Sequence, residues 1–180
     1  MAEPEAFAPH KLVIGVLSSR PSAWERVCSD LEGLFGPPDH LSEAIPFTFT
    51  HYYDREMGTP IQRRFYSCRD LVDPERLAAI KLRTNALEGR YREAGSRRVN
   101  LDPGLLCLSR LVLATTKEGA HRIPLRSGIY AEVTLIFEKG DFRPLPWTYP
   151  DYRSERYRGI LREIRALYKA AMHQPPPSRH

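Results

Sequence analysis

The order in which two hydrophobic periodicities alternate along the chain is the feature that most constrains its fold. The apolar run at residues 11–17 predicts a buried strand. Apolar residues then recur at intervals of three and four over 24–35, which is typical of an amphipathic helix. The alternating segment 47–53, rich in aromatics and threonine, predicts a second strand, and 63–68 predicts a third that pairs with it as a hairpin. The first half of the chain therefore has the predicted order β-α-β-β.

The second half begins with a helix signal at Asp73-Pro74, an acidic cap followed by proline at the first helical position. We expect this helix to reach Ala94 and a short strand to follow over 98–101. The further expected elements are a short helix over 102–108, a strand or helix end over 111–115, a hairpin of 121–125 and 129–137, and a closing helix with an apolar stripe over 157–168. The first six elements have the βαββαβ order of a ferredoxin-like fold. The sequence thus predicts an α+β fold of this order, with an added C-terminal β-hairpin and closing helix on an antiparallel or mixed sheet.

The length of 180 residues suits one domain with one hydrophobic core. We expect a single α+β domain over 11–172, between a disordered lead at 1–10 and a disordered, proline-rich tail at 173–180. No apolar stretch approaches the roughly 20 residues that a membrane span needs, and the N-terminus lacks a basic start and an apolar run. Three cysteines without a CxxC pair fit a reducing compartment, so we expect a cytoplasmic protein with no membrane partner.

The formal net charge of +5 raises the question of nucleic acid as a partner. The arginines are spread along the chain at spacings that suggest solvated helix faces instead of one basic patch. The sequence also contains no aromatic RNP motif, KH loop or zinc-finger spacing. These observations argue against nucleic acid as the partner.

The helix expected after Asp73 carries polar residues beside its apolar stripe. Lys81, Thr84 and Glu88 recur at helical spacing away from the arginine face, where a simple surface helix would have apolar residues. Burying a charge costs several kcal/mol unless the charge is paired. Two interpretations remain open: these residues bind a ligand in a polar pocket, or Lys81 and Glu88 form a pair at the core boundary.

A second group of polar residues lies in and before the strand expected at 129–137. Tyr130 and Glu132 alternate with the apolar side of that strand, as either a pocket wall or an ordinary solvent face would. The preceding segment offers hydroxyl, ammonium, imidazole and guanidinium groups within a few residues, and such groups suit a phosphate or a carboxylate. These residues are Thr116, Lys117, His121 and Arg122. The alternative is a polar loop without a ligand.

Several known site motifs are absent from the sequence. It has no GxxxxGK[ST] phosphate loop, no GxGxxG dinucleotide motif and no GxSxG around a serine. The candidate ligands for Mg²⁺ are Asp54, Glu56, Asn100 and Asp102, with His121 and Glu132, although their spacing matches no metal signature. The loop at 147–152 places Trp147 and Tyr149 where they either pack down or stack on a ligand.

These residues fall in blocks that resemble a known family. The blocks are FTFTHYYDREMG at 47–58, KLRTNALE at 81–88, RRVNLDPG at 97–104, LVLATTKEGAHRI at 111–123, GIYAEVTL at 128–135 and WTYPDY at 147–152. They resemble an uncharacterised bacterial family, a domain of unknown function, from about Lys11 to Tyr168. Some of its members are labelled GTP-binding proteins, a label that no G-motif in this sequence supports. The chain departs from the family pattern at Leu105 and Pro124, where the resemblance implies tyrosine, so a ligand that touches either position would differ here.

We expect the polar residues to converge on one cleft that holds a small anionic metabolite, of which a nucleotide is one kind. Its ligand-binding residues would be Lys81, Thr84, Glu88, Asn100, Asp102, Thr116, Lys117, Arg122, Tyr130, Trp147 and Tyr149. If the protein is an enzyme, His121 and Glu132 are the expected acid–base pair. The alternative is a non-catalytic RNA-binding or protein-interaction module, which would turn Phe47, Phe49, Tyr53 or Phe65 toward solvent.

Overall fold

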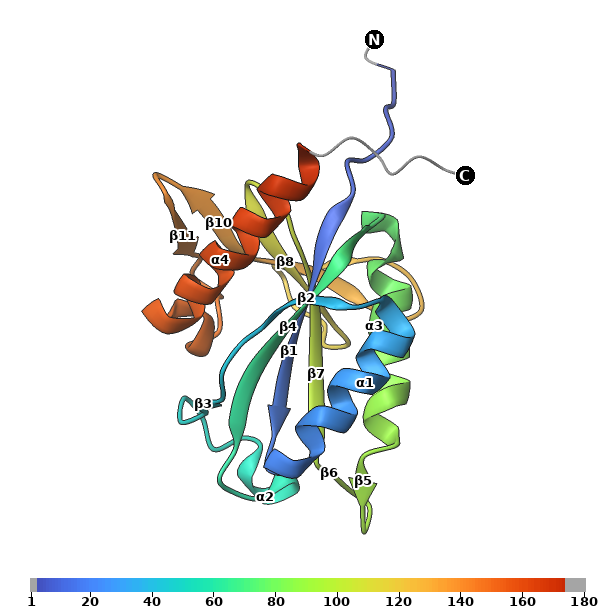
Figure 1. The fold of residues 1–180 in the computed structure, drawn as a ribbon, viewed down its shortest axis with the longest axis vertical. Helices are drawn as coiled ribbons and strands as arrows, with labels where there is room; N and C mark the ends of the chain where they lie inside the picture. The colour runs from blue at the N-terminus through green and yellow to red at the C-terminus, as the bar shows by residue number, and fades with distance from the viewer. Residues whose placement is uncertain (1–2, 174–180) are drawn as a thin grey trace.

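The computed structural model describes residues 3–173, and a single large sheet runs through it (Figure 1). The strand order is β11-β10-β8-β7-β1-β4-β2, and all neighbouring strands in the described chain are antiparallel. The strands on this path are β1 (His10–Ser18), β2 (Pro38–Leu41), β4 (Gln62–Val72), β7 (Val99–Leu106), β8 (Arg110–Thr115), β10 (Tyr130–Glu138) and β11 (Asp141–Pro144). Short strands β3 (Ile45–Pro46) and β9 (Ile123–Pro124) pair with β4 and β10, and β5 (Arg92–Glu93) with β6 (Ser96–Arg97) forms a separate hairpin. The predicted α+β class is confirmed.

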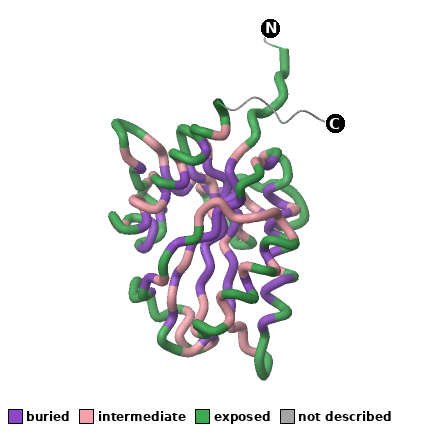
Figure 2. The backbone as a smooth tube through the Cα atoms, viewed as in Figure 1, coloured by how far each residue is buried: buried purple, intermediate pink, exposed green. Residues whose placement is uncertain are grey.

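The helices cover the two faces of this sheet unequally. The helices are α1 (Trp24–Phe35), α2 (Asp54–Met57), α3 (Leu77–Gly89) and α4 (Glu155–Met172), with 3₁₀ turns at Pro21–Ala23, Pro74–Arg76 and Asp151–Arg153. Helices α1 and α3 lie side by side on one face, which we call the α1/α3 face, over Leu12, Ile14 and Leu101. Helix α4 covers part of the opposite face, the α4 face. The two cores follow from the period-two alternation of β1, and Figure 2 shows the buried backbone concentrated in the central strands.

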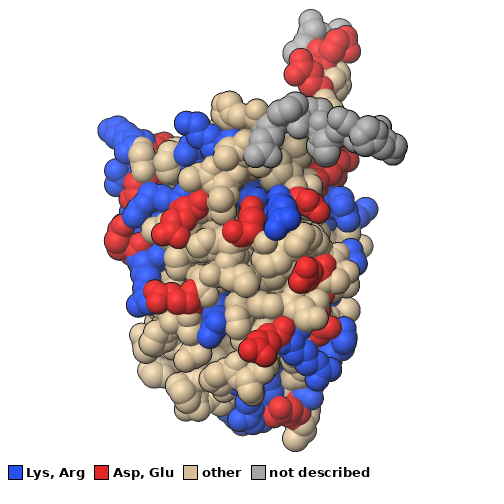
Figure 3. Space-filling view, in the orientation of Figure 1, with Lys and Arg blue, Asp and Glu red and all other residues tan. Residues whose placement is uncertain are grey.

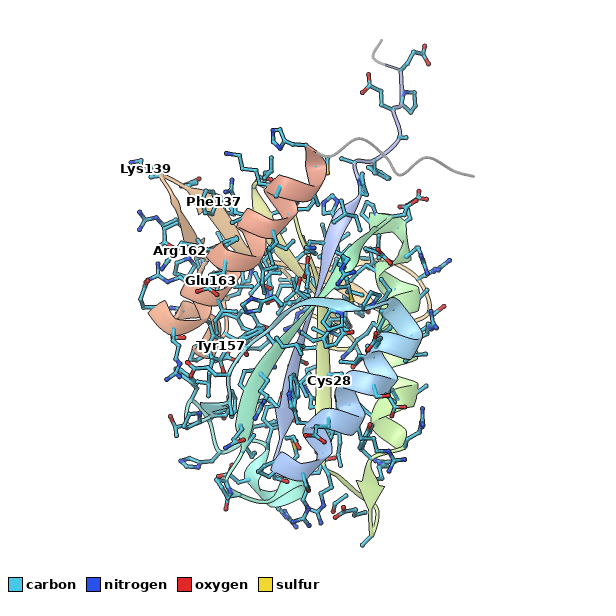
Figure 4. The ribbon with its side chains drawn as sticks, viewed as in Figure 1. Cys28, Phe137, Lys139, Tyr157, Arg162 and Glu163 are labelled. Atoms are coloured by element: carbon cyan, nitrogen blue, oxygen red, sulfur yellow. The ribbon has the colours of Figure 1, made fainter. Side chains whose placement is uncertain are left out.

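Helix α4 is amphipathic, as its sequence pattern predicts. Tyr157, Leu161 and Ile164 are fully buried against the sheet, with aromatic neighbours such as Phe65. Tyr157 and Arg162, labelled in Figure 4, belong to the buried and the charged sides of this helix respectively. Ser154 caps its first turn by accepting a hydrogen bond from the Tyr157 backbone N–H. No helix among residues 3–173 is both long and apolar enough to cross a membrane.

The strand predicted at 47–53 is wrong. Only Ile45–Pro46 pairs with β4 in this region, and the main partner of β4 on that side is β2, which the aromatic pattern does not reveal. The aromatic residues pack in a small cluster instead: Phe47 and Tyr53 lie against Leu17 and Met57, with their rings 6.0 Å apart. Aromatic side chains are enriched wherever they can be buried, so their density alone does not indicate a pleated strand.

The chain between 90 and 115 also differs from the prediction. Helix α3 ends at Gly89 instead of Ala94, and the β5–β6 hairpin follows, turning at Ala94 and Gly95 in the left-handed region. No helix forms over 102–108, because β7 continues through Pro103 to Leu106. The sequence pattern also missed β11. The strand predicted over 121–125 is only the two-residue strand β9, Ile123–Pro124, in the structure.

The predicted disordered ends remain predictions. Residues 3–9 form no regular secondary structure, and β1 begins at His10. The predicted tail lies outside the described residues apart from His173, which follows α4.

Hydrogen bonding between β7 and β8 stops on the N-terminal side of Gly104 in β7, and side chains of α3 bind the β7 edge that is left unpaired. The β7–β8 ladder ends at Gly104 opposite Leu113. Beyond it, Lys81 Nζ donates to the Leu101 carbonyl at 2.8 Å, and Glu88 Oε1 accepts from the Leu101 N–H at 2.7 Å. Both backbone groups are buried and have no strand partner on this side, so the two side chains replace a missing ladder.

Replacement of Glu88 by alanine should therefore destabilise the fold. The buried Leu101 N–H would lose its acceptor, which costs about 1–3 kcal/mol in free energy of unfolding. Chemical denaturation measures this loss, with Arg83→Ala on the solvent side of the same helix as the control. Glu88→Gln keeps an acceptor and should lose less than Glu88→Ala. Equal stability of Glu88→Ala and the control would contradict the edge-capping role.

Candidate functional site

A polar cluster lies on the α4 face of the sheet, where β7 and β8 have separated. Residues that pair across neighbouring strands have side chains on the same face of the sheet. Glu132 pairs with Leu113, and Leu113 pairs with Gly104. Asp102, two residues before Gly104 in β7, therefore lies on the same face as Glu132. We divide the cluster into a Glu132 group and an Arg63 group. The Glu132 group consists of His121, Arg122, Glu132, Trp147 and Tyr149, and the Arg63 group of Glu56, Arg63, Arg97, Asn100, Asp102 and Asp151.

The carboxylate of Glu132 is the centre of its group. The residue is 1% exposed, and its Oε2 accepts from His121 Nε2 at 3.0 Å and from Arg122 Nε at 2.8 Å. Its other oxygen, Oε1, is buried and has no hydrogen-bond partner among the described residues. A buried carboxylate oxygen normally accepts a hydrogen bond, so Oε1 is an open acceptor within the cluster.

The surrounding side chains hold this carboxylate in place. Arg122 also donates to the Tyr149 hydroxyl at 2.8 Å and to the Lys117 carbonyl at 3.0 Å, so its guanidinium links the 116–122 loop to the 145–150 loop. The His121 ring stacks on Trp147, with centroids 5.1 Å apart and planes at 17°. Trp147 in turn donates to the Val133 carbonyl on β10 at 2.8 Å. Two loops are thus fixed to the strand that carries Glu132.

The Arg63 group is built around a buried guanidinium. Arg63 is 3% exposed and donates to Asp102 Oδ2 at 2.9 Å and to Asp151 Oδ2 at 3.1 Å, which joins β4, β7 and the turn before α4. Gly15 leaves room for it on β1, because a Cβ at that position would lie 2.6 Å from the Arg63 guanidinium. Asp102 Oδ1 accepts from Asn100 Nδ2 at 2.8 Å.

A short chain of contacts extends the Arg63 group toward α2 and α3. Arg97 donates to Asn100 Oδ1 at 2.9 Å and to both carboxylate oxygens of Glu56. It also lies 3.6 Å from Glu88 Oε2. The edge-capping carboxylate of α3 is therefore connected to the cluster through Arg97.

Burial and neighbouring charges shift the ionisation of this cluster in opposite directions. Burial opposes ionisation of Asp102, but the positive charges of Arg63 and Lys81 outweigh it and lower its pKa. Burial raises the pKa of Asp151, and the nearby charge of Asp102 adds to this effect. Burial also raises the pKa of Tyr149, with further increases from the negative charges of Glu132, Asp102 and Asp151. Acids of both groups thus contribute to the raised pKa of Tyr149.

The structure brings together most of the residues predicted from the loops and strands. Asn100, Asp102, His121, Arg122, Glu132, Trp147 and Tyr149 belong to the cluster. Lys117 lies in the adjoining loop with its ammonium 4.7 Å from the Tyr52 ring centroid, and Thr116 precedes it. Tyr130 is half-buried on β10, opposite Thr115 of β8.

The predicted helix residues are placed differently. Lys81 donates a hydrogen bond to the Leu101 carbonyl, and Glu88 accepts one from the Leu101 N–H. Thr84 donates to the Lys81 carbonyl at 2.9 Å. They lie on the helix that packs against the other face of the sheet. Lys81 and Glu88 form no ion pair with each other among the described residues, so the boundary pair is not seen, and ligand binding by these residues stays a prediction.

Sequence reasoning missed Arg63 and Asp151. A signal existed for Arg63, since the alternation of β4 places it on the same side as the buried Phe65. The sequence offers no sign that Asp151 is its partner 88 residues away. Nor do the candidate Mg²⁺ ligands form a site of their own, because residues 3–173 contain no group of three His, Cys, Asp or Glu able to hold a metal.

The cluster combines fixed ion pairs with one open acceptor. Its arginines already bind carboxylates, so they orient the acidic groups and are not free to bind an anion. Two buried polar atoms of the cluster, Oε1 of Glu132 and Nε of Arg63, have no hydrogen-bond partner among the described residues, and the adjoining Lys117 is exposed. A carboxylate beside an imidazole also has the composition of a proton-transfer pair.

The three cysteines are free and differ sharply in their environments. Burial opposes ionisation of Cys107, but hydrogen bonds from His10 and Ser109 outweigh it and lower the pKa of this thiol to about 6. Burial raises the pKa of Cys28 to about 11 and that of Cys68 to about 12. Cys107 is half-buried, in the turn between β7 and β8.

Cys107 should therefore react with iodoacetamide well ahead of the other two cysteines at pH 7, because the thiolate is the nucleophile. Its alkylation rate should fall as the pH drops through about 6 and change little above pH 7. Peptide mass spectrometry after timed quenching measures each thiol separately, and Cys107→Ser should remove the fast phase. A midpoint near 8.5, the value of an ordinary cysteine, would refute the assignment.

Comparison with known proteins gives the chain a family. No curated protein and no solved structure matches it. One family model matches residues 8–168, which spans the sheet, the four helices up to Tyr168 of α4 and the whole polar cluster. The chain belongs to the family described as a domain of unknown function (DUF4416), as the resemblance in its sequence blocks predicts.

Proposed function

We propose that the polar cluster binds a small anionic metabolite that also carries hydrogen-bond donors, such as a nucleotide or a sugar phosphate. The observation that carries this proposal is the unpartnered Oε1 of Glu132, in a carboxylate otherwise held by His121 and Arg122. A hydroxyl or amino group of the ligand would satisfy this oxygen. A tightly held carboxylate with one free acceptor is the geometry expected of a recognition group.

Lys117 is the residue we assign to the anionic part of the ligand. Its side chain is exposed, and its ammonium contacts only the face of the Tyr52 ring among the described residues. An ammonium on a flexible stem can move from this ring to a phosphate or carboxylate. Tyr149, which is half-exposed beside Arg122, supplies a further hydroxyl and a flat surface for a ring.

We also retain His121 and Glu132 as the acid–base pair if the ligand is a substrate. Their nitrogen and oxygen lie 3.0 Å apart, within reach of a proton transfer. Trp147 holds the imidazole plane by stacking, which would fix the direction of that transfer. The three free cysteines support the reducing, cytoplasmic setting that we expect for such a protein.

The rival RNA-binding function loses its structural motivation. Phe47 and Phe65 are buried, and Tyr53 packs within the same cluster as Phe47, so the sheet does not offer them to bases. Phe49 is partly exposed but contacts the ring of Tyr157. On the face in Figure 3, acidic side chains are interspersed among the basic ones. Ion pairs such as Arg158 with Asp141 also neutralise part of the basic charge of the described chain. A small-molecule ligand fits these observations better.

A thermal-shift screen of nucleotides and sugar phosphates, with and without Mg²⁺, tests the proposal. A ligand present at 100 times its Kd should stabilise the protein by about 2.7 kcal/mol. Absence of stabilisation across the panel would contradict the proposal. Salt-dependent binding of RNA at low salt, without any response to the small molecules, would favour the rival instead.

Glu132→Gln in the same assay tests whether the Glu132 carboxylate, with its unpartnered Oε1, binds the ligand. The neutral amide should weaken ligand binding by about ten- to a hundredfold, since hydrogen bonds to charged groups contribute about 1.5–3 kcal/mol. Glu138→Gln, at the exposed end of the same strand, is the matched control and should bind normally. If Glu132→Gln lowers the melting temperature but binds the ligand fully, Glu132 only stabilises the fold. Lys117→Ala, on the surface, provides a second test in a variant expected to fold.

A further inference from the structure

A groove of about 530 Å³ lies on the α1/α3 face of the sheet, opposite the polar cluster. Its floor is formed by Leu105 of β7, Val112 of β8 and Ala131 of β10. The groove exists because α3 packs mainly over β7 while the sheet continues to β10, which leaves Val112 and Ala131 only partly buried. Its volume falls within the range of about 300–1,000 Å³ that small-molecule sites occupy.

The walls of the groove are also apolar. Leu77, at the start of α3, forms one side, and Leu125, in the loop before β10, forms the other. Leu125 is 43% exposed, although it adjoins an apolar floor. Apolar floor and walls together favour a ligand with a hydrocarbon part, because such a ligand removes this surface from water.

Charged side chains at the rim of the groove have one dominant sign. Arg110 and Arg126 are exposed there, and neither forms an ion pair within residues 3–173. His10 is a third basic residue that lines the groove, and its Nδ1 hydrogen-bonds with the Ala8 carbonyl at 2.8 Å. Glu75 is the single acidic residue that lines the groove. Guanidinium groups bind carboxylates with two parallel hydrogen bonds, which an ammonium cannot do.

We propose that this groove binds an amphipathic anion, a single-chain fatty carboxylate, with its head at Arg110 and Arg126 and its chain along Leu105, Val112 and Ala131. The apolar surface and the unpaired guanidinium groups match the two parts of that molecule. A neutral hydrocarbon would leave the arginines unused, and a small anion such as acetate would leave the floor exposed to water. This site is separate from the polar cluster and does not depend on its function.

Isothermal titration calorimetry of the full chain with decanoate, below its micelle concentration, tests the site. Decanoate should bind with a stoichiometry near one. Acetate should not bind, and decanol should bind at least about tenfold more weakly, because it lacks the charge that the arginines recognise. Failure of decanoate to bind, or equal binding of decanol, would overturn the proposal.

Variants locate the binding on the molecule. Arg110→Ala combined with Arg126→Ala should weaken decanoate binding about tenfold or more, whereas Arg69→Ala combined with Arg143→Ala removes the same charge elsewhere and should have no effect. Ala131→Leu keeps both arginines but fills the floor, and it should shorten the longest carboxylate that binds. Unchanged binding in both the arginine and the Ala131 variants would refute the location.

The same experiments would also reveal two other possible occupants of the groove, a second copy of the chain or a membrane surface. If sedimentation detects a dimer that Ala131→Leu dissociates, and decanoate does not bind to the dimer, the groove is an interface between two copies. Binding to anionic phospholipid vesicles without binding of free decanoate would assign the surface to a membrane. Either result would overturn the fatty carboxylate.

Discussion

The end of hydrogen bonding between β7 and β8 is the constraint on which the rest of this structure depends. Leu101 directs its N–H and C=O away from β1, toward side chains of α3, and Pro103 faces the same way two residues later. Proline has no N–H to donate, so the ladder with β8 cannot continue at Pro103, and it ends at Gly104. The freed edge needs hydrogen-bond partners, which Lys81 and Glu88 supply at Leu101.

Charge burial on both sides of this edge is the second consequence. Lys81 and Glu88 satisfy the edge from one face, while Arg63 and Asp102 occupy the other, and all four depend on nearby partners of opposite charge or on backbone groups. Breaking such a buried pair costs about 3–5 kcal/mol. The ion pairs therefore fix how β4, β7 and the turn before α4 are arranged, and Glu132 lies beside a rigid framework. Because the Glu132 carboxylate is held in place, its Oε1 cannot turn toward another hydrogen-bond donor, as the oxygen of a mobile carboxylate could.

Sequence reasoning succeeded where one local pattern determines the outcome. The apolar run of β1 and the amphipathic stripes of α1 and α4 predicted those elements, and the polar residues near 121 and 132 predicted the Glu132 group. Sequence reasoning failed where the position of a side chain depends on a residue distant in the sequence. Phe47 is buried against Met57 and Ile61 and does not lie in a strand. Arg63 and Asp151, 88 residues apart, are brought together only by the fold. Lys81 and Glu88 were correctly identified as buried polar residues, but the backbone edge that they serve belongs to β7 and has no local sequence signal.

The two proposed sites, on opposite faces of the sheet, would differ in the kind of recognition that they perform. In the polar cluster the guanidinium groups are already bound to carboxylates, so a ligand would be selected by the direction of a few hydrogen bonds more than by net charge. In the groove the arginines are unpaired and the floor is apolar, so selection would follow charge and chain length. Strands β7, β8 and β10 contribute to both surfaces, because alternate residues such as Ala131 and Glu132 point to opposite faces.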